Sequence, residues 1–137
     1  MPNRVEWNPR HSVGEASLDA QHQELLARCN ALAEYLADPD TDPEADRRFD
    51  QAFKELMALA RAHFTAEEAL LSARGFDGID ALRNEVEEFD YLAAEIVTTE
   101  NFDRQELQTF LSLWWAGHVA GTASEHRECL AGPPESP

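Results

Sequence analysis

The segment HFTAEE, residues 63–68, places a histidine and a glutamate one helical turn apart. Apolar residues recur around this segment at spacings of three and four, which is the pattern of one face of an α-helix. His63 and Glu67 both fall on that apolar stripe. Burying a carboxylate without a partner costs free energy, so Glu67 is expected to have a specific partner in the core.

The same periodicity recurs in three other segments, and helix-breaking residues separate the segments. The four stripes are Leu18, His22, Leu25, Cys29, Leu32 and Leu36; Phe49, Phe53, Leu56, Ala60, His63, Glu67 and Leu70; Ile79, Leu82, Val86, Phe89, Ala93 and Ile96; and Leu107, Phe110, Leu111, Trp114, Trp115 and His118. No strand-like alternation of useful length occurs. The sequence therefore predicts an all-α protein, an up-down-up-down four-helix bundle.

The chain is expected to form one domain of 18–130 between two terminal segments. Residues 1–17 show little periodicity and are expected to form an ordered N-terminal arm, with Glu15 exposed in it. Residues 131–137 read AGPPESP, in which Gly132 and the two prolines that follow it cannot continue a helix, and they are expected to be a disordered tail. Asp42 and Pro43 are expected to cap and open the second helix, and Gly75 to end it.

The composition excludes several classes of partner. The net charge is −16, from 27 acidic and 11 basic residues, and so acidic a surface argues against nucleic acid or an anionic membrane. No apolar run is long enough for a transmembrane helix, and no secretory signal is visible, so the chain is expected in the cytoplasm. The two cysteines have no metal-binding spacing, and no protein partner is indicated.

Four polar residues interrupt the apolar stripes: His22, His63, Glu67 and His118. An antiparallel bundle can bring side chains from three helices to one level. Three imidazoles and a carboxylate are suitable ligands for iron or zinc, and a metal ion would compensate the charge of Glu67. The alternative is that each residue is an ordinary hydrogen-bonded core residue, and the spacing alone leaves both interpretations open.

Three segments together resemble the bacterial hemerythrin-like proteins: VEWNPRHSVGEASLDAQHQEL, HFTAEEALLSARGF and LSLWWAGHV. The resemblance implies a four-helix bundle with a non-haem di-iron centre that binds O2 reversibly, held by five His, one Glu and one Asp. His22, His63 and His118 match three of the family's histidine ligands, and Glu67 matches its bridging glutamate. No haem is implied.

The remaining three ligand positions of the family correspond to Leu82, Val86 and Ala123, which cannot coordinate a metal. Carboxylate and amide side chains lie nearby, but bringing them inward from beside the stripe would expose Leu82 and Val86, at about 1.5–3 kcal/mol each. The nearby residues are Asp80, Asn84, Glu85 and Glu88. His126, eight residues after His118, is expected near the exposed end of its helix.

These departures favour a hemerythrin-like protein with a degenerate centre that holds one metal ion, iron preferred and zinc the alternative. Its open positions would take O2 or another small ligand. Reversible O2 carriage is not expected, because a single iron does not supply the two electrons that reduce O2 to peroxide. Two alternatives stay open: a metal-free binding or regulatory module, and a non-haem iron oxidoreductase that uses O2 or peroxide, for which no catalytic residue is assigned.

Overall fold

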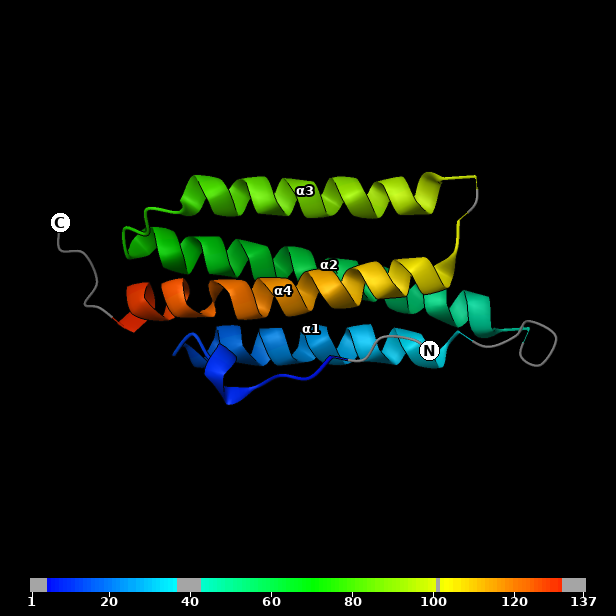
Figure 1. The fold of residues 1–137 in the computed structure, drawn as a ribbon, viewed down its shortest axis with the longest axis horizontal. Coiled ribbons are helices and arrows are strands. Elements are labelled where there is room, and N and C mark those ends of the chain that lie inside the picture. The colour runs from blue at the N-terminus through cyan, green and yellow to red at the C-terminus, as the bar shows by residue number, and fades with distance from the viewer. Residues whose placement is uncertain (1–4, 37–42, 101, 132–137) are drawn as a thin grey trace.

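The computed structural model describes residues 5–36, 43–100 and 102–131. In these ranges the chain forms a short 3-10 helix, η1 (Pro9–His11), and the long helices α1 (Ala16–Glu34), α2 (Ala45–Ala73), α3 (Ile79–Thr98) and α4 (Arg104–Ala131). Successive long helices run in opposite directions along one axis (Figure 1). The all-α four-helix bundle is therefore confirmed. Among the described helices, none combines the length and the apolar character that crossing a membrane requires.

The start of α1 depends on Glu15. Its carboxylate accepts a hydrogen bond from the backbone N–H of Leu18 at 3.0 Å, and this occupies one of the unpaired donors of the first helical turn. The helix consequently begins at Ala16, two residues before the first residue of the predicted stripe. Glu15 is a half-buried capping residue, and the prediction that it is exposed is wrong.

The end of α2 follows from Gly75, whose φ of +70° lies in the left-handed region that favours glycine. The N–H of Gly75 donates to the carbonyl of Ser72 at 3.1 Å, and the N–H of Phe76 donates to that of Leu71 at 3.0 Å. This pair of hydrogen bonds is the Schellman motif, which satisfies the last carbonyls of a helix. The predicted role of Gly75 is confirmed.

The start of α2 differs from the prediction. Pro43 and Glu44 form a turn, and the helix begins only at Ala45, so Pro43 does not open it. The backbone N–H of Arg48 donates to the carbonyl of Glu44 at 3.0 Å, which closes the first turn. Asp42, the predicted capping residue, lies outside the described residues.

The apolar stripes pack into two connected clusters of buried side chains. The larger cluster includes Trp115, whose ring stacks on Phe64 with the centroids 5.2 Å apart. The smaller cluster comprises Val13, Leu18, Leu71, Leu82 and Leu130. His22 lies on α1 between Leu18 of the smaller cluster and Leu25 of the larger one. The polar residues of the core thus form a layer between two apolar clusters.

The segment before α1 is held against the bundle by hydrogen bonds. The backbone N–H of Val5 donates to Oδ1 of Asn30 at 2.8 Å, and the side chain of Arg127 on α4 donates to the carbonyl of Ser12 at 2.7 Å. The division into arm, bundle and tail stays a prediction, since residues 132–137 lie outside the described part of the chain.

Candidate metal centre

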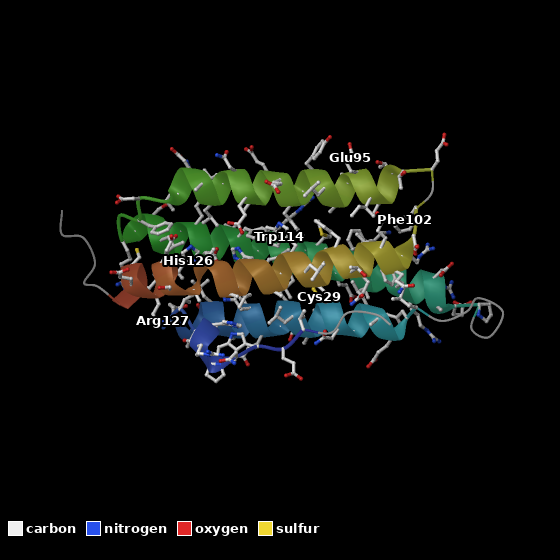
Figure 2. The ribbon with its side chains drawn as sticks, viewed as in Figure 1. Cys29, Glu95, Phe102, Trp114, His126 and Arg127 are labelled. Atoms are coloured by element: carbon white, nitrogen blue, oxygen red, sulfur yellow. The ribbon has the colours of Figure 1, made fainter. Side chains whose placement is uncertain are left out.

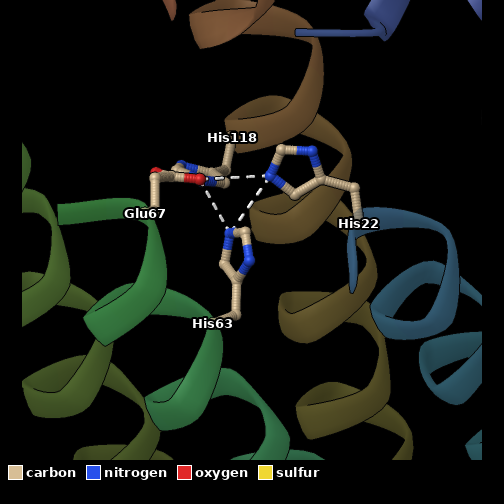
Figure 3. Close-up of side chains that lie close together, drawn as sticks. All are labelled: His22, His63, Glu67 and His118. Atoms are coloured by element: carbon tan, nitrogen blue, oxygen red, sulfur yellow. Dashed lines mark hydrogen bonds and ion pairs between the residues drawn. The ribbon is translucent and has the colours of Figure 1, made fainter. Parts of the chain in front are cut away.

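Three helices bring the four polar core residues together. α1 supplies His22, α2 supplies His63 and Glu67 one turn apart, and α4 supplies His118. His22, His63 and Glu67 are fully buried, and His118 is 3% exposed. One nitrogen or oxygen atom from each residue lies within 4.8 Å of those from the other three (Figure 3).

The carboxylate of Glu67 is the common partner of the three imidazoles. Its Oε2 lies 2.8 Å from Nε2 of His63 and 3.2 Å from Nε2 of His22, and its Oε1 lies 3.2 Å from Nε2 of His118. The Nε2 atoms of His22 and His63 are themselves 3.1 Å apart. Two donors of one ion at about 2.1 Å each lie roughly 3.0–4.2 Å apart, so these separations suit a shared metal ion.

Hydrogen bonds from Nδ1, the ring nitrogen that points away from the centre, orient two of the imidazoles. Nδ1 of His63 donates to Oε1 of Gln21 at 2.8 Å, and Nδ1 of His118 donates to Oε1 of Glu85 at 2.8 Å. Amide and carboxylate oxygens accept hydrogen bonds, so Nδ1 carries the hydrogen in both rings. Nε2 is then the atom that faces the centre, as in metal sites whose histidines bind a carboxylate or amide oxygen through the second nitrogen.

Glu85 lies partly on the buried face of α3, whereas it was predicted to lie beside that face. It follows Leu82 by three positions and precedes Phe89 by four, so it shares the buried face of α3 with both. Its side chain is 33% exposed and reaches His118 without any rotation of the helix. The nearby Asp80, Asn84 and Glu88 are exposed, as predicted. The spacing of three residues from Leu82 and four to Phe89 could have indicated that Glu85 lies on the buried face of α3.

The hydrogen bonds of the centre decide its protonation in the metal-free protein. Burial alone would raise the pKa of Glu67, but its contacts with His118, His22 and His63 outweigh burial and hold the pKa of this carboxyl well below its usual range. Burial alone would lower the pKa of His118, but hydrogen bonds to Glu67 and Glu85 outweigh it and raise the pKa to about 9. Burial lowers the pKa of His63. Near neutral pH, the metal-free centre therefore pairs an ionised Glu67 with a His118 imidazolium.

His126 lies inside the bundle, and the prediction of an exposed position is wrong. The residue is 2% exposed, and its Nδ1 lies 3.9 Å from Oε1 of Glu67. The ring of Phe76 packs against it edge to face, with centroids 5.2 Å apart. His126 continues a buried stripe along α4 with steps of four, four, three and four, which was the overlooked signal. This stripe is Trp115, Val119, Ala123, His126 and Leu130.

The positions where the resemblance implies further ligands carry hydrocarbon side chains. Leu82 and Ala123 are buried, at 4% and 3% exposure, and Val86 is half-buried. On α3, the polar contact to the four-residue group therefore comes from Glu85 through His118.

Comparison with known proteins gives the family. The model of the hemerythrin HHE cation binding domain matches residues 13–126, which is most of the chain. The chain belongs to the hemerythrin family. Hemerythrin-like proteins from Naegleria gruberi and Naegleria fowleri are each 26% identical over 130 residues, covering 95% of this chain and 97% of theirs. No solved structure matches the chain. The hemerythrin match spans His22, His63, Glu67 and His118, so the chain is a hemerythrin-like, metal-binding protein.

Proposed function

We propose that this hemerythrin-family chain binds one non-haem metal ion, iron in preference to zinc, at the four-residue centre. The ligands are Nε2 of His22, His63 and His118 and the carboxylate of Glu67. The observation that supports this most is the convergence of four buried donor atoms, each within 4.8 Å of the others, inside a cation-binding domain. Two histidines and a carboxylate suit iron(II), and with the third histidine the set also suits zinc.

The donor groups fit a cation in a second respect. Oε1 of Glu67 is buried and has no hydrogen-bond partner within the described residues, although Nε2 of His118 lies 3.2 Å away. A buried acceptor without a partner is costly, and a cation at the centre would satisfy it. Gln21 and Glu85 already hold two of the rings with Nε2 directed inward.

The surroundings restrict what can reach the ion to small molecules. When bound, the ion supplies a positive charge and open coordination positions. Leu82, Val86 and Ala123 carry hydrocarbon side chains at the positions where the family resemblance implies ligands. Phe64, Leu82 and Val86 also line a surface groove of about 490 Å³ between α2 and α3. The ring of Phe64 lies 5.9 Å from that of His118, centroid to centroid, and separates groove from centre. A small apolar molecule such as O2 suits this approach.

A metal-free module is the second candidate, and one observation favours it. The His118 imidazolium already pairs with Glu67 and Glu85, so the centre has charge compensation without an ion. No enzymatic reaction is proposed, because the described groove is not lined by His22, His63, Glu67 or His118.

Metal content decides between the two candidates. Untagged protein purified without chelator is expected to contain about one iron or zinc per chain by mass spectrometry, and His63→Ala and Glu67→Ala are expected to lose it. Ser112→Ala, at a buried polar residue of α4 outside the centre, is the control and should keep the ion. Absence of metal even after anaerobic iron loading would support the metal-free module. Metal that survives both ligand substitutions would show that the site is assigned to the wrong residues.

A further inference from the structure

We propose that His126 and Glu67 hold a second cation position, on the side of the Glu67 carboxylate that faces the C-terminal half of α4. This inference rests on the proposed function, because the first ion would be shared through the same carboxylate. His126 is 2% exposed, and Figure 2 places it between α4 and α2. It lies outside the four-residue group at the centre.

Two buried polar atoms face each other here without a hydrogen bond. Nδ1 of His126 and Oε1 of Glu67 both have no hydrogen-bond partner among the described residues, and they are 3.9 Å apart. That separation exceeds the length of an N–H···O hydrogen bond, about 2.7–3.2 Å. Buried polar atoms in proteins almost always have partners. A cation at the four-residue centre would satisfy Oε1 of Glu67 but would leave Nδ1 of His126 without a partner, so a further group that neither side chain supplies is expected beside this nitrogen.

A metal ion fits this gap by distance and by chemistry. An imidazole nitrogen and a carboxylate oxygen that bind one ion at about 2.1 Å lie roughly 3.0–4.2 Å apart, and the observed 3.9 Å is inside that range. An imidazole nitrogen and a carboxylate oxygen are both ordinary protein ligands of divalent metal ions.

This position uses different residues from those of the family pattern. The resemblance implies ligands at Leu82, Val86 and Ala123, none of which has a donor atom in its side chain. His126 lies three residues beyond Ala123 on the same buried stripe of α4. Among the described residues, Nδ1 of His126 and Oε1 of Glu67 are the two proposed ligands, with water completing the coordination, so the second ion should bind more weakly than the first.

The test is an anaerobic titration of the metal-depleted full chain with Co2+, followed by absorbance and by metal analysis after dialysis. The wild type is expected to bind two equivalents, the second more weakly. His126→Leu should bind one, because leucine has a carbon at the position of Nδ1. His126→Asp should restore the second equivalent, because its Oδ1 is as many bonds from Cα as Nδ1 of histidine. Phe76→Leu is the matched control for packing around His126, and it should retain both equivalents.

The outcomes separate the two proposals. One equivalent in both the wild type and His126→Leu would overturn the second position and leave a bridging water in the gap, while the four-residue centre would stand. No bound Co2+ in the wild type would overturn both. A measurement on the wild type tests the proposal even if His126→Leu does not fold. Protein labelled with ¹⁵N-histidine is titrated with Zn2+ and followed by NMR. The Nδ1 resonance of His126 should shift when the second equivalent of Zn2+ is added. A shift completed by the first equivalent would contradict a separate ion.

Discussion

Metal uptake should depend steeply on pH, because the ion must displace a proton from His118. Contacts with Glu67 and Glu85 raise the pKa of His118 to about 9, whereas the pKa values of Glu67 and His63 are lowered, so those two groups hold no proton to release between pH 7 and 9. At pH 7, which is about two units below the pKa of His118, nearly every His118 carries a proton that the metal ion must displace. This competition weakens metal binding about 100-fold, which corresponds to about 3 kcal/mol at 1.36 kcal/mol per pH unit. Apparent affinity should therefore rise about tenfold per pH unit and level off near pH 9.

The assay is competition for Zn2+ against a chromophoric chelator, corrected for the chelator's own protonation. Calorimetry in buffers of different ionisation enthalpy counts the protons released, and about one per ion is expected at pH 7.5. Glu85→Gln is the informative variant, since it removes a carboxylate that raises the pKa of His118, and its affinity should level off at lower pH. A flat affinity between pH 7 and 9, with no proton released, would refute the reasoning.

The raised pKa of His118 also affects the stability of the metal-free protein, which should fall as pH rises, whereas metal affinity should rise. The pKa of His118 is raised in the folded state, so its contribution to stability is complete below the unfolded value of 6.5 and is lost as pH rises through about 9. The thermal midpoint of metal-free protein should fall across that window. In metal-saturated protein, where the ion replaces the proton, this fall should be absent.

Three further substitutions or treatments test the fold and the centre separately. Gly75→Ala should lower the free energy of unfolding by about 1 kcal/mol in urea titration, because alanine is strained at a φ of +70°; an unchanged midpoint would contradict that backbone geometry. Phe89→Ala should cost about 3–5 kcal/mol, since this ring is fully buried among aromatic side chains; a cost near zero would mean that α3 does not pack as described. Chelation should lower the thermal midpoint of the wild type but not of Glu67→Ala, and equal effects on both would place the ion elsewhere.

Helical periodicity was sufficient to predict the bundle and to place the four polar core residues on its inward-facing stripes. A stripe with steps of three and four defines one helix face, and these faces pack together in a bundle, so His22, Glu67 and His118 could lie at one level. Periodicity does not fix that level, and the structure shows that they meet. Gly75 was equally predictable, because few residues other than glycine tolerate the left-handed conformation that ends α2.

Glu85 and His126 were placed wrongly for a common physical reason. The buried face of a packed helix is wider than one row of residues, so neighbours such as Glu85 and Val86 both lie partly inside. Hydropathy counts Glu85 and His126 as surface residues, whereas the contacts that keep them inside come from His118 and Glu67 on other helices. Such contacts depend on the relative rotation of the helices, which periodicity does not specify.

The four-residue centre takes none of its members from α3. Among the described residues, Glu85 contacts this centre through His118, and the buried residues of α3 are Leu82, Phe89 and Ala93. Fluctuations that detach α3 would therefore leave His22, His63, Glu67 and His118 assembled on the other three helices. In native-state hydrogen exchange, bound metal should slow the amides of α1, α2 and α4 far more than those of α3. Local detachment of α3 would then admit small solutes to the ion while the four residues that bind it stay in place.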